Sequence, residues 1–458
     1  MEEAWIRNMP ENFGSMEWKD VTNLHPLAAI LLVVLSIALI VSPRHWAILP
    51  MFILACFVSS VQKIVVVTLD FNLLRVMILC GIARIWLRGE HKDFQWKAID
   101  KALVFWSISA TIICTLQAKS MGAFINRIGY SFEGLGMYFL FRIFLKNWKD
   151  LETVIVGCAL VGIPVAAAFA IEFATARNAF AIFGGVPEVT MVRQGELRCQ
   201  GAFAHPIIAG SFWAPLLPLF IAMWWKPGQF GKLWAIVGVL CCLFIIATCN
   251  SSTPAFGVVA TIMGGLAFRF RHSMKLIRRG VVAILCVLHV IMKGPVWSLI
   301  AKASSFGGGT GYHRFLLVDQ AIRRFPEWCI LGTTSTAHWG WGLQDVTNHY
   351  VLEGVHGGAL TLIFFIAVIV LGFRGVGQLW RMQTSKYHLV LSWALGISLF
   401  VHCLDFIGVS YFGHIYLVWY LSLAMIGSFT PARAYARKTV LVRQAKAGPG
   451  RIEALQVP

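Results

Sequence analysis

Long apolar stretches, separated by short polar connections, dominate the chain between about residue 25 and residue 429. Most have the roughly 17–25 residues that a helix needs to cross the hydrocarbon core of a bilayer. No stretch alternates apolar and polar positions for long, which argues against a transmembrane barrel. The pattern therefore predicts an all-α polytopic transmembrane helical bundle of about 12–13 spans. The predicted spans cover residues 25–42, 47–67, 71–87, 102–118, 128–145, 152–173, 206–225, 233–249, 254–268, 280–299, 349–373, 388–404 and 412–429.

Basic residues predict the orientation of these spans. They cluster in alternate connections, and this places those connections on the cytoplasmic side together with the basic tail, 430–458. We expect the tail to lie on the anionic inner leaflet. The acidic N-terminal segment, 1–24, then falls on the outer side of the single transmembrane domain, 25–429. The clustered basic residues outside the tail are Arg88, Lys92, Lys97, Lys101, Arg269, Arg271, Lys275, Arg278, Arg279, Arg374, Arg381 and Lys386.

The composition agrees with a membrane protein. Hydrophobic residues make up 58% of the 458 residues and charged residues 13%, whereas about 25% of a soluble domain is charged. The net charge of +18 is compatible with nucleic-acid binding, but the basic residues follow the membrane topology and form no basic domain with interleaved aromatic residues. We therefore expect membrane lipids, and no nucleic acid, among the partners.

Two connections on the outer side are long, at about 174–205 and 300–348. Loops of this size without a span of their own usually carry function. Both contain basic residues, and because long loops translocate regardless of charge, these residues are no topological signal. They are either solvated loop charges or groups that bind something anionic. They are Arg193, Arg198, Arg314, Arg323 and Arg324.

Two cysteines, Cys199 and Cys329, fall in these outer loops. Disulfides form in an oxidising compartment, so a bridge between them is one interpretation. Their spacing favours the other interpretation, two free thiols.

The end of the first loop is a candidate anion site. Pro206 suits the first turn of a helix, because its φ is fixed and it has no N–H to leave unpaired. Arg198 and His205 would then lie just above the membrane at a helix N-terminus. Free N–H groups and the helix dipole favour a phosphate at such a position, and an arginine adds to both.

The second loop contains apolar residues at helical spacing, namely Phe315, Val318, Ile322 and Phe325. This spacing predicts an amphipathic helix that lies in the membrane interface. Its arginines would meet lipid phosphates if the helix forms a site; otherwise the helix is only structural.

The second loop closes with residues 345–350, before a long apolar span. Asp345 or Thr347 is expected to cap that helix. His349 and His356 are seven residues apart and share one helical face. A histidine at the mouth of a span, facing a basic loop, is a candidate general base or else a hydrogen-bonded packing residue. The histidines are too scattered to specify a metal site, and no nucleotide-binding loop is present, so neither a metal nor a cofactor is expected.

Taken together, several of these segments, over roughly residues 190–375, resemble the motifs of a known family. The string Arg198-x-x-Gly201-x-Phe203-x-His205-Pro206, the stretch from Arg314 to Gly332, and Thr347-Asn348-His349-Tyr350 followed by Gly357-Gly358 occur in this order. The order and spacing resemble those of the O-antigen ligase and polysaccharide polymerase superfamily of membrane glycosyltransferases. The turn Asn250-Ser251-Ser252 stands where relatives carry a Ser-Arg turn.

The resemblance implies a multi-pass glycosyltransferase of the bacterial inner (cytoplasmic) membrane. Its donor would be a polyprenyl-pyrophosphate-linked glycan, which it would transfer to a hydroxyl of a lipid or glycan acceptor without metal or nucleotide. Both long loops would be periplasmic. Arginines would stabilise the pyrophosphate, and a histidine would take the acceptor's proton. The residues implied are His349 as the base and, for pyrophosphate and glycan, Arg198, His205, Arg314, Asp345, Asn348 and Tyr350.

The sequence also departs from the superfamily's pattern. Thr347 stands where members often have histidine, and His349 follows the asparagine instead. His356 stands where relatives often have glutamate. Residues i and i+2 point about 200° apart on a helix, so the two histidine positions are not interchangeable there.

Three other functions are open on the sequence. One is a non-catalytic membrane scaffold, which would leave the outer arginines and histidines unexplained. A polymerase of O-antigen or exopolysaccharide units would use the same donor and differ only in its acceptor. A transporter or flippase for a lipid-linked glycan would show inverted repeats and charges at mid-membrane. No clear internal repeat is found, and the ionisable residues gather toward the outer ends of the spans.

Overall fold

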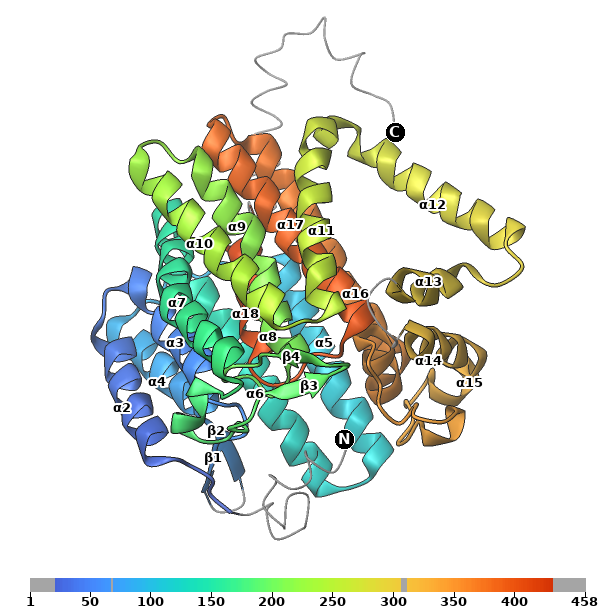
Figure 1. Ribbon diagram of the computed structural model, residues 1–458, viewed down its shortest axis with the longest axis horizontal. Helices are drawn as coiled ribbons and strands as arrows, with labels where there is room; N and C mark the ends of the chain where they lie inside the picture. The colour runs from blue at the N-terminus through green and yellow to red at the C-terminus, as the bar shows by residue number, and fades with distance from the viewer. Residues whose placement is uncertain (1–20, 67–68, 306–310, 431–458) are drawn as a thin grey trace, which may run out of the picture.

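The computed structural model describes residues 21–66, 69–305 and 311–430. In Figure 1, most helices stand side by side in an upright bundle, and α12 to α15 lie to one side of it. The only sheets in the described part are two antiparallel hairpins of two strands each. The prediction of an all-α helical protein is confirmed, whereas the N-terminal segment and the basic tail fall almost wholly outside the described residues.

The elements follow one another in chain order. The α-helices of the described part are α2 (Pro26–Val41), α3 (Leu49–Phe57), α4 (Leu73–Arg88), α5 (Ala98–Ala118), α6 (Met121–Phe144), α7 (Trp148–Thr175), α8 (Pro206–Trp213), α9 (Leu217–Ala222), α10 (Gln229–Thr248), α11 (Ser252–Ala267), α12 (Met274–Ile291), α13 (Leu299–Ser305), α14 (Gly311–Arg323), α15 (Phe325–Trp328), α16 (His349–Met382), α17 (Lys386–Gly408) and α18 (Ile415–Phe429). The strands are β1 (Lys63–Val66), β2 (Leu69–Asn72), β3 (Met191–Arg193) and β4 (Glu196–Arg198).

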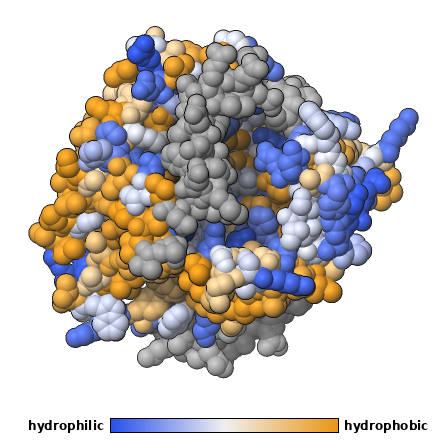
Figure 2. Space-filling view, turned by 90° about the horizontal axis from the view of Figure 1, so that it is seen from below, coloured by the Kyte–Doolittle hydropathy of each residue, from blue (hydrophilic) through white to orange (hydrophobic). Residues whose placement is uncertain are grey.

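In the part of the chain that the structure describes, six helices are long and apolar enough to cross a membrane, judged by length and composition. They are Ala98–Ala118, Trp148–Thr175, Pro206–Trp225, Gln229–Thr248, His349–Met382 and Lys386–Gly408. Ser252–Ile291 together with Val296–Lys302, bent by 98°, would be a seventh. Seen from below, hydrophobic residues cover the left flank of the molecule, and hydrophilic residues gather in the middle and on the right (Figure 2). A multi-pass membrane protein accounts for this surface, because only a bilayer accepts so many exposed apolar side chains.

Two predicted spans differ from the structure. The segment 47–67 is helical only as far as Phe57 and then enters the β1–β2 hairpin. The β-branched run at residues 64–67 favours a strand, and Ser59 and Gln62 bond to the backbone of the first long connection, at Gly185 O (2.8 Å) and Phe183 O (2.7 Å). The segment 280–299 is interrupted after Ile291, where α12 ends, and becomes helical again only at Val296; no residue of α12 is buried.

A buried carboxylate on α7 positions the first long connection. Glu172 is fully buried and accepts hydrogen bonds from the backbone N–H groups of Gln200 and Gly201, both at 3.0 Å. Gly201 has φ +58°, and a Cβ there would collide with the ring of Phe169. The chain can therefore turn tightly between β4 and α8, which holds Arg198 and His205 close to each other.

The second long connection docks into a break in α16. Gly358 interrupts the helix with φ +67°, and the carbonyl groups and N–H groups freed there bond to the connection. The N–H of Ala359 donates to Cys329 O (2.8 Å), and the N–H of Thr333 donates to Val355 O (2.7 Å). Gly332 has φ +75°, and a Cβ on it would collide with Val355 O. This docking places α14 beside the start of α16.

Candidate functional site

A cavity of about 810 Å³ lies where the two long connections meet the ends of the helices. We call it the basic cavity. Its wall comes from the β3–β4 hairpin, the starts of α8 and α11, the start of α14, the residues before α16 and the α17–α18 turn. The polar residues in this wall are Arg193, Gln194, Glu196, Arg198, His205, Asn250, Ser251, Ser252, His313, Arg314, Asp345, Thr347 and Ser410.

Two arginines of this wall are buried. Arg198 is 6% exposed and Arg314 is 8% exposed. Arg198 donates through Nε to Asn250 O (3.2 Å), and Arg314 donates through Nη2 to Thr253 Oγ1 (3.2 Å). Within the described ranges, neither guanidinium has a carboxylate at ion-pair distance. Burial lowers the pKa of both groups, with a further lowering from the nearby charge of Arg193.

Unpaired buried charges are costly, since removal from water is compensated only by an opposite charge or by hydrogen bonds. Arg314 Nε and Thr347 Oγ1 are both buried and find no hydrogen-bond partner among the described residues. An anion in the cavity would satisfy the guanidinium and accept from the hydroxyl. The wall is therefore suited to a multiply charged anion such as pyrophosphate.

Helix N-termini add to this preference. His205 is the N-cap of α8, Ser251 is the N-cap of α11, and both line the cavity. The α16 helix also begins here, with Thr347 in the wall just before its N-cap, Asn348. Each N-terminus carries unpaired N–H groups and the positive end of a helix dipole, so three of them favour negative charge at one place.

His205 presents a donor to the cavity. Its Nδ1 accepts a hydrogen bond from the N–H of Ile207 (3.2 Å), so the proton of the neutral ring sits on Nε2. Burial, together with the charges of Arg198 and Arg193, lowers its pKa from 6.5 to about 4. His205 is therefore neutral at pH 7 and is suited to donate to a phosphate oxygen.

His313 has the same tautomer as His205, but its N–H is used by the protein and its other nitrogen has no such bond among the described residues. Its Nε2 lies 3.0 Å from Gly342 O, and a carbonyl oxygen only accepts, so Nε2 carries the proton. The Nδ1 lone pair is then available as a proton acceptor. The sequence analysis did not single out His313, although its position next to Arg314 was a usable signal.

The structure brings together four of the seven residues that the resemblance implied. Arg198, His205, Arg314 and Asp345 line the basic cavity, with Asp345 exposed at its wall. Arg314 lies on the buried face of α14 and lines the basic cavity, so it is not on the exposed face of that helix. The exposed arginine of that helix is Arg323, which pairs with Asp319 at 2.7 Å.

Asn348 and Tyr350 hold α16 in place and do not line the cavity. Asn348 caps α16, because its Oδ1 accepts from the N–H of Val351 (3.1 Å), and its Nδ2 donates to Ile407 O (3.2 Å). The cap is therefore neither Asp345 nor Thr347, the two expected residues, but Asn348, one residue past Thr347. The Tyr350 hydroxyl donates to Cys403 O (3.0 Å).

His349 is fully buried and is not part of the cavity wall. Its Nδ1 accepts from the N–H of Tyr411 (3.2 Å), and its ring stacks on Phe406 with 4.8 Å between centroids. The expectation that His349 faces the basic loop is therefore wrong. Its neighbours are those of a packing residue, the other interpretation that the sequence left open.

Two further expectations concern metals and thiols. Among the described residues, no group of three or more His, Cys, Asp or Glu side chains could hold a metal ion. Cys199 and Cys329 are both free thiols, as their spacing favoured.

Comparison of the chain with protein-family models and with curated proteins finds no match.

Proposed function

We propose that the protein is a glycosyltransferase that takes a glycan from a polyprenyl-pyrophosphate carrier and transfers it to an acceptor hydroxyl. The observation that carries the proposal is the pair of buried arginines, Arg198 and Arg314, which line one cavity and have no carboxylate partner among the residues that the structure describes. A membrane-bound, doubly charged leaving group matches both the charge and the location of this wall.

The proposal includes a topology. The chain would cross a bacterial inner membrane in 12–13 spans, with the shorter apolar helices included. The connections 174–205 and 300–348 would be periplasmic, α14 would lie near the membrane interface, and the basic tail would be cytoplasmic. This arrangement puts the basic cavity on the periplasmic side, where a flipped carrier lipid exposes its pyrophosphate.

The reaction is a displacement at the anomeric carbon of the donor glycan. The acceptor oxygen forms a bond to this carbon while the bond from the carbon to the pyrophosphate oxygen breaks. The electron pair leaves with the carrier pyrophosphate, where Arg198 and Arg314 stabilise the added charge and His205 donates a hydrogen bond. The proton of the acceptor hydroxyl passes to Nδ1 of His313, which replaces His349 as the proposed base.

The test is a transfer assay with purified protein, a polyprenyl-pyrophosphate glycan and a panel of lipid and saccharide acceptors, with and without EDTA. Removing one charged donor from such a site costs about 10²–10³ in kcat, so Arg198→Met and Arg314→Met should each lose at least that factor. Arg323→Met is the matched control, because Arg323 is on the same helix as Arg314 but 71% exposed. It should retain transfer within about twofold of the parent.

The outcomes separate the candidate functions. A lipid acceptor would indicate a ligase, whereas a growing glycan acceptor would indicate a polymerase. Transfer that survives in both arginine variants, or that EDTA abolishes, would contradict the proposal. Donor binding without any transfer, together with donor movement across vesicles, would indicate a flippase instead.

A further inference from the structure

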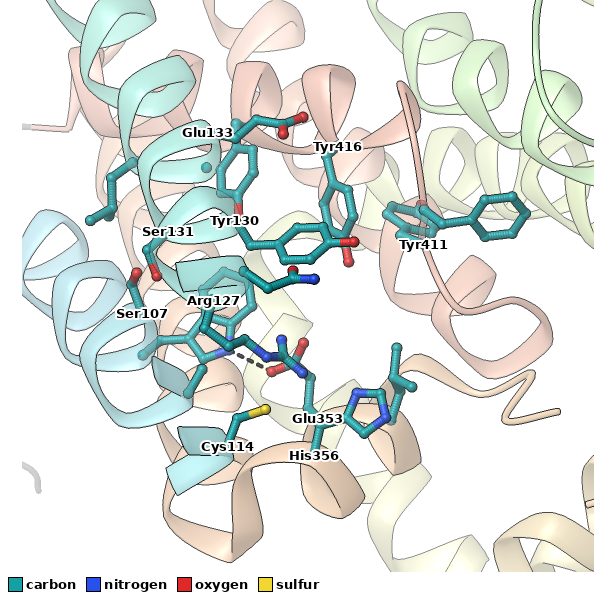
Figure 3. A pocket seen from close by; sticks show the side chains of 18 of the residues that line it. Ser107, Cys114, Arg127, Tyr130, Ser131, Glu133, Glu353, His356, Tyr411 and Tyr416 are labelled. Atoms are coloured by element: carbon teal, nitrogen blue, oxygen red, sulfur yellow. Dashed lines mark hydrogen bonds between the residues drawn. The ribbon is translucent and has the colours of Figure 1, made fainter. Parts of the chain in front are cut away.

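A second cavity, of about 450 Å³, opens between α5, α6, α16 and α18. We call it the aromatic cavity. Figure 3 shows tyrosine rings on one side of it and a group of polar side chains on the other. Its wall includes Trp106, Arg127, Tyr130, Glu353, His356 and Tyr416.

The polar side of the aromatic cavity centres on Glu353. Its carboxylate accepts from Trp106 Nε1 (2.6 Å), and its other oxygen lies 3.6 Å from His349 Nε2. Figure 3 shows Arg127 directed toward Glu353 and His356. Glu133, also in the wall, is already paired with Arg75 at 3.0 Å. A carboxylate and a cation thus face the same space, which gives a wall of nearly balanced charge with both donors and acceptors.

The two cavities adjoin at the α17–α18 turn. Phe412 lines both of them, whereas Ser410 lines only the basic cavity and Tyr411 lines only the aromatic one. This turn is the common wall between a space suited to an anion and a space without excess charge.

We propose that the aromatic cavity binds the acceptor saccharide of the reaction, a neutral pyranose whose hydroxyl attacks the donor glycan. This inference rests on the proposed function. Tyrosine and tryptophan rings present flat apolar faces with polar edges, and the C–H face of a pyranose packs on such rings. The carboxylate of Glu353 and the guanidinium of Arg127 would bond the ring hydroxyls, as convergent polar groups do in ligand pockets.

The position of the cavity favours the acceptor over the donor. In a displacement, the nucleophile approaches the anomeric carbon opposite to the leaving group. The leaving pyrophosphate belongs at the buried arginines of the basic cavity, so the acceptor approaches from the Phe412 side, where the two cavities adjoin. From there its hydroxyl would extend into the basic cavity, which His313 lines.

The experiment measures saccharide binding without donor, by saturation-transfer NMR on the full-length protein in detergent. The probes are methyl glycosides of glucose, galactose and N-acetylglucosamine and their disaccharides. Glu353→Gln keeps an acceptor for Trp106, and Tyr130→Ala removes a ring that is already 55% exposed. Each should weaken saccharide binding at least tenfold and raise the KM for the acceptor by a similar factor, with the KM for the donor within twofold.

Ile128→Ala is the matched control, on the same helix as Tyr130, 46% exposed and outside the cavity wall. It should bind saccharide as the parent does. Absence of binding by every probe, or binding that the Glu353 and Tyr130 variants leave unchanged, would overturn the inference. So would displacement of the bound saccharide by the soluble glycan of the donor.

Failure of the proposed function gives a different result. In that case Arg198→Met and Arg314→Met would leave pyrophosphate binding intact, whatever the saccharide measurements show. Loss of the saccharide site alone would leave donor binding and its dependence on the arginines unchanged.

Discussion

Among single residues, the most informative for function are those in the wall of the basic cavity whose buried polar atoms have no hydrogen-bond partner among the described residues. Arg314 Nε and Thr347 Oγ1 belong to two different helix starts, yet both end buried at the same cavity. The sequence indicated Arg198, His205 and Arg314 because arginine, proline and helix starts have strong local signatures. It could not show that His349 packs among Phe406 and Tyr411. The direction of a side chain on a helix depends on the residue at which the helix begins, and the sequence did not locate that residue.

His313 and His349 should behave differently on substitution. His313→Gln keeps an N–H donor for Gly342 O but has no basic nitrogen, so kcat should fall by about 10²–10⁴ with the donor KM unchanged. His349→Ala removes the acceptor for the Tyr411 N–H from a fully buried site, so it should lower the melting temperature. Steady-state kinetics and thermal unfolding separate the two effects. A His313→Gln enzyme with parental kcat would exclude this base.

The lowered pKa of His205 predicts a pH dependence of stability. Its folded-state pKa of about 4 lies below the usual 6.5, so the unfolded chain binds more protons between these values. The contribution of this group to stability is therefore complete above about pH 6.5 and declines as the pH falls toward 4. Melting curves from pH 8 to pH 4 should show less decline in His205→Asn, which retains a capping side chain but does not titrate there.

Anion binding should reverse this pKa shift. A bound pyrophosphate diester adds negative charge beside His205 and raises its pKa back toward 6.5, so binding takes up a proton between about pH 4 and pH 6.5. Affinity for the donor should thus increase as the pH falls from 7 to 5. Calorimetry in buffers of different ionisation enthalpy measures the proton uptake, and an equal uptake in His205→Asn would assign it to another group.

Among the elements, the helices were predictable and the departures from helix were not. Apolar length located every predicted span on at least part of a helix, because hydrophobicity is a property of the local sequence. The β1–β2 hairpin and the break in α16 depend on partners far along the chain, such as Gly185 and Cys329. Nothing local in the sequence of α16 distinguishes Gly358 from a glycine inside a regular helix.

Substitution of Gly358 tests how strongly the second connection depends on the break. Gly358→Ala forces a side chain into φ +67° and against Ile330 O, so it should cost about 1–3 kcal/mol or more. Gly265→Ala is the control, because a Cβ there meets nothing within 4 Å, and it should stabilise α11 by about 0.5–1 kcal/mol. Thermal unfolding in detergent compares the two. Equal melting temperatures would show that the connection does not depend on this glycine.

At the scale of the whole molecule, charge and hydrophobicity divide the surface in a way that fits one orientation in a bilayer. The two cavities share the α17–α18 turn and open on the side opposite the α16–α17 connection. From the sequence, the distribution of lysine and arginine predicts that the α16–α17 connection faces the cytoplasm and the two cavities face the other side. The sequence could not predict that the two long connections meet at one cavity, because contacts between distant loops leave no local sequence pattern.

The orientation can be tested with single added thiols. Gln344→Cys, beside the basic cavity, should react with a membrane-impermeant maleimide in intact spheroplasts. Thr384→Cys, between α16 and α17, should react only after lysis. Both positions are exposed. The parent protein has an exposed thiol of its own, Cys286, so its labelling is measured as the background. The reverse pattern would invert the proposed topology.

The two glycines where the second connection meets α16 have a consequence for how this protein can diverge. Gly332 and Gly358 each lie against the backbone of the other's segment, at Val355 and Ile330. Neither can acquire a side chain unless the other segment moves away. Lineages descended from a common ancestor should therefore keep both glycines or lose both, even where the rest of the connection has changed in length and composition.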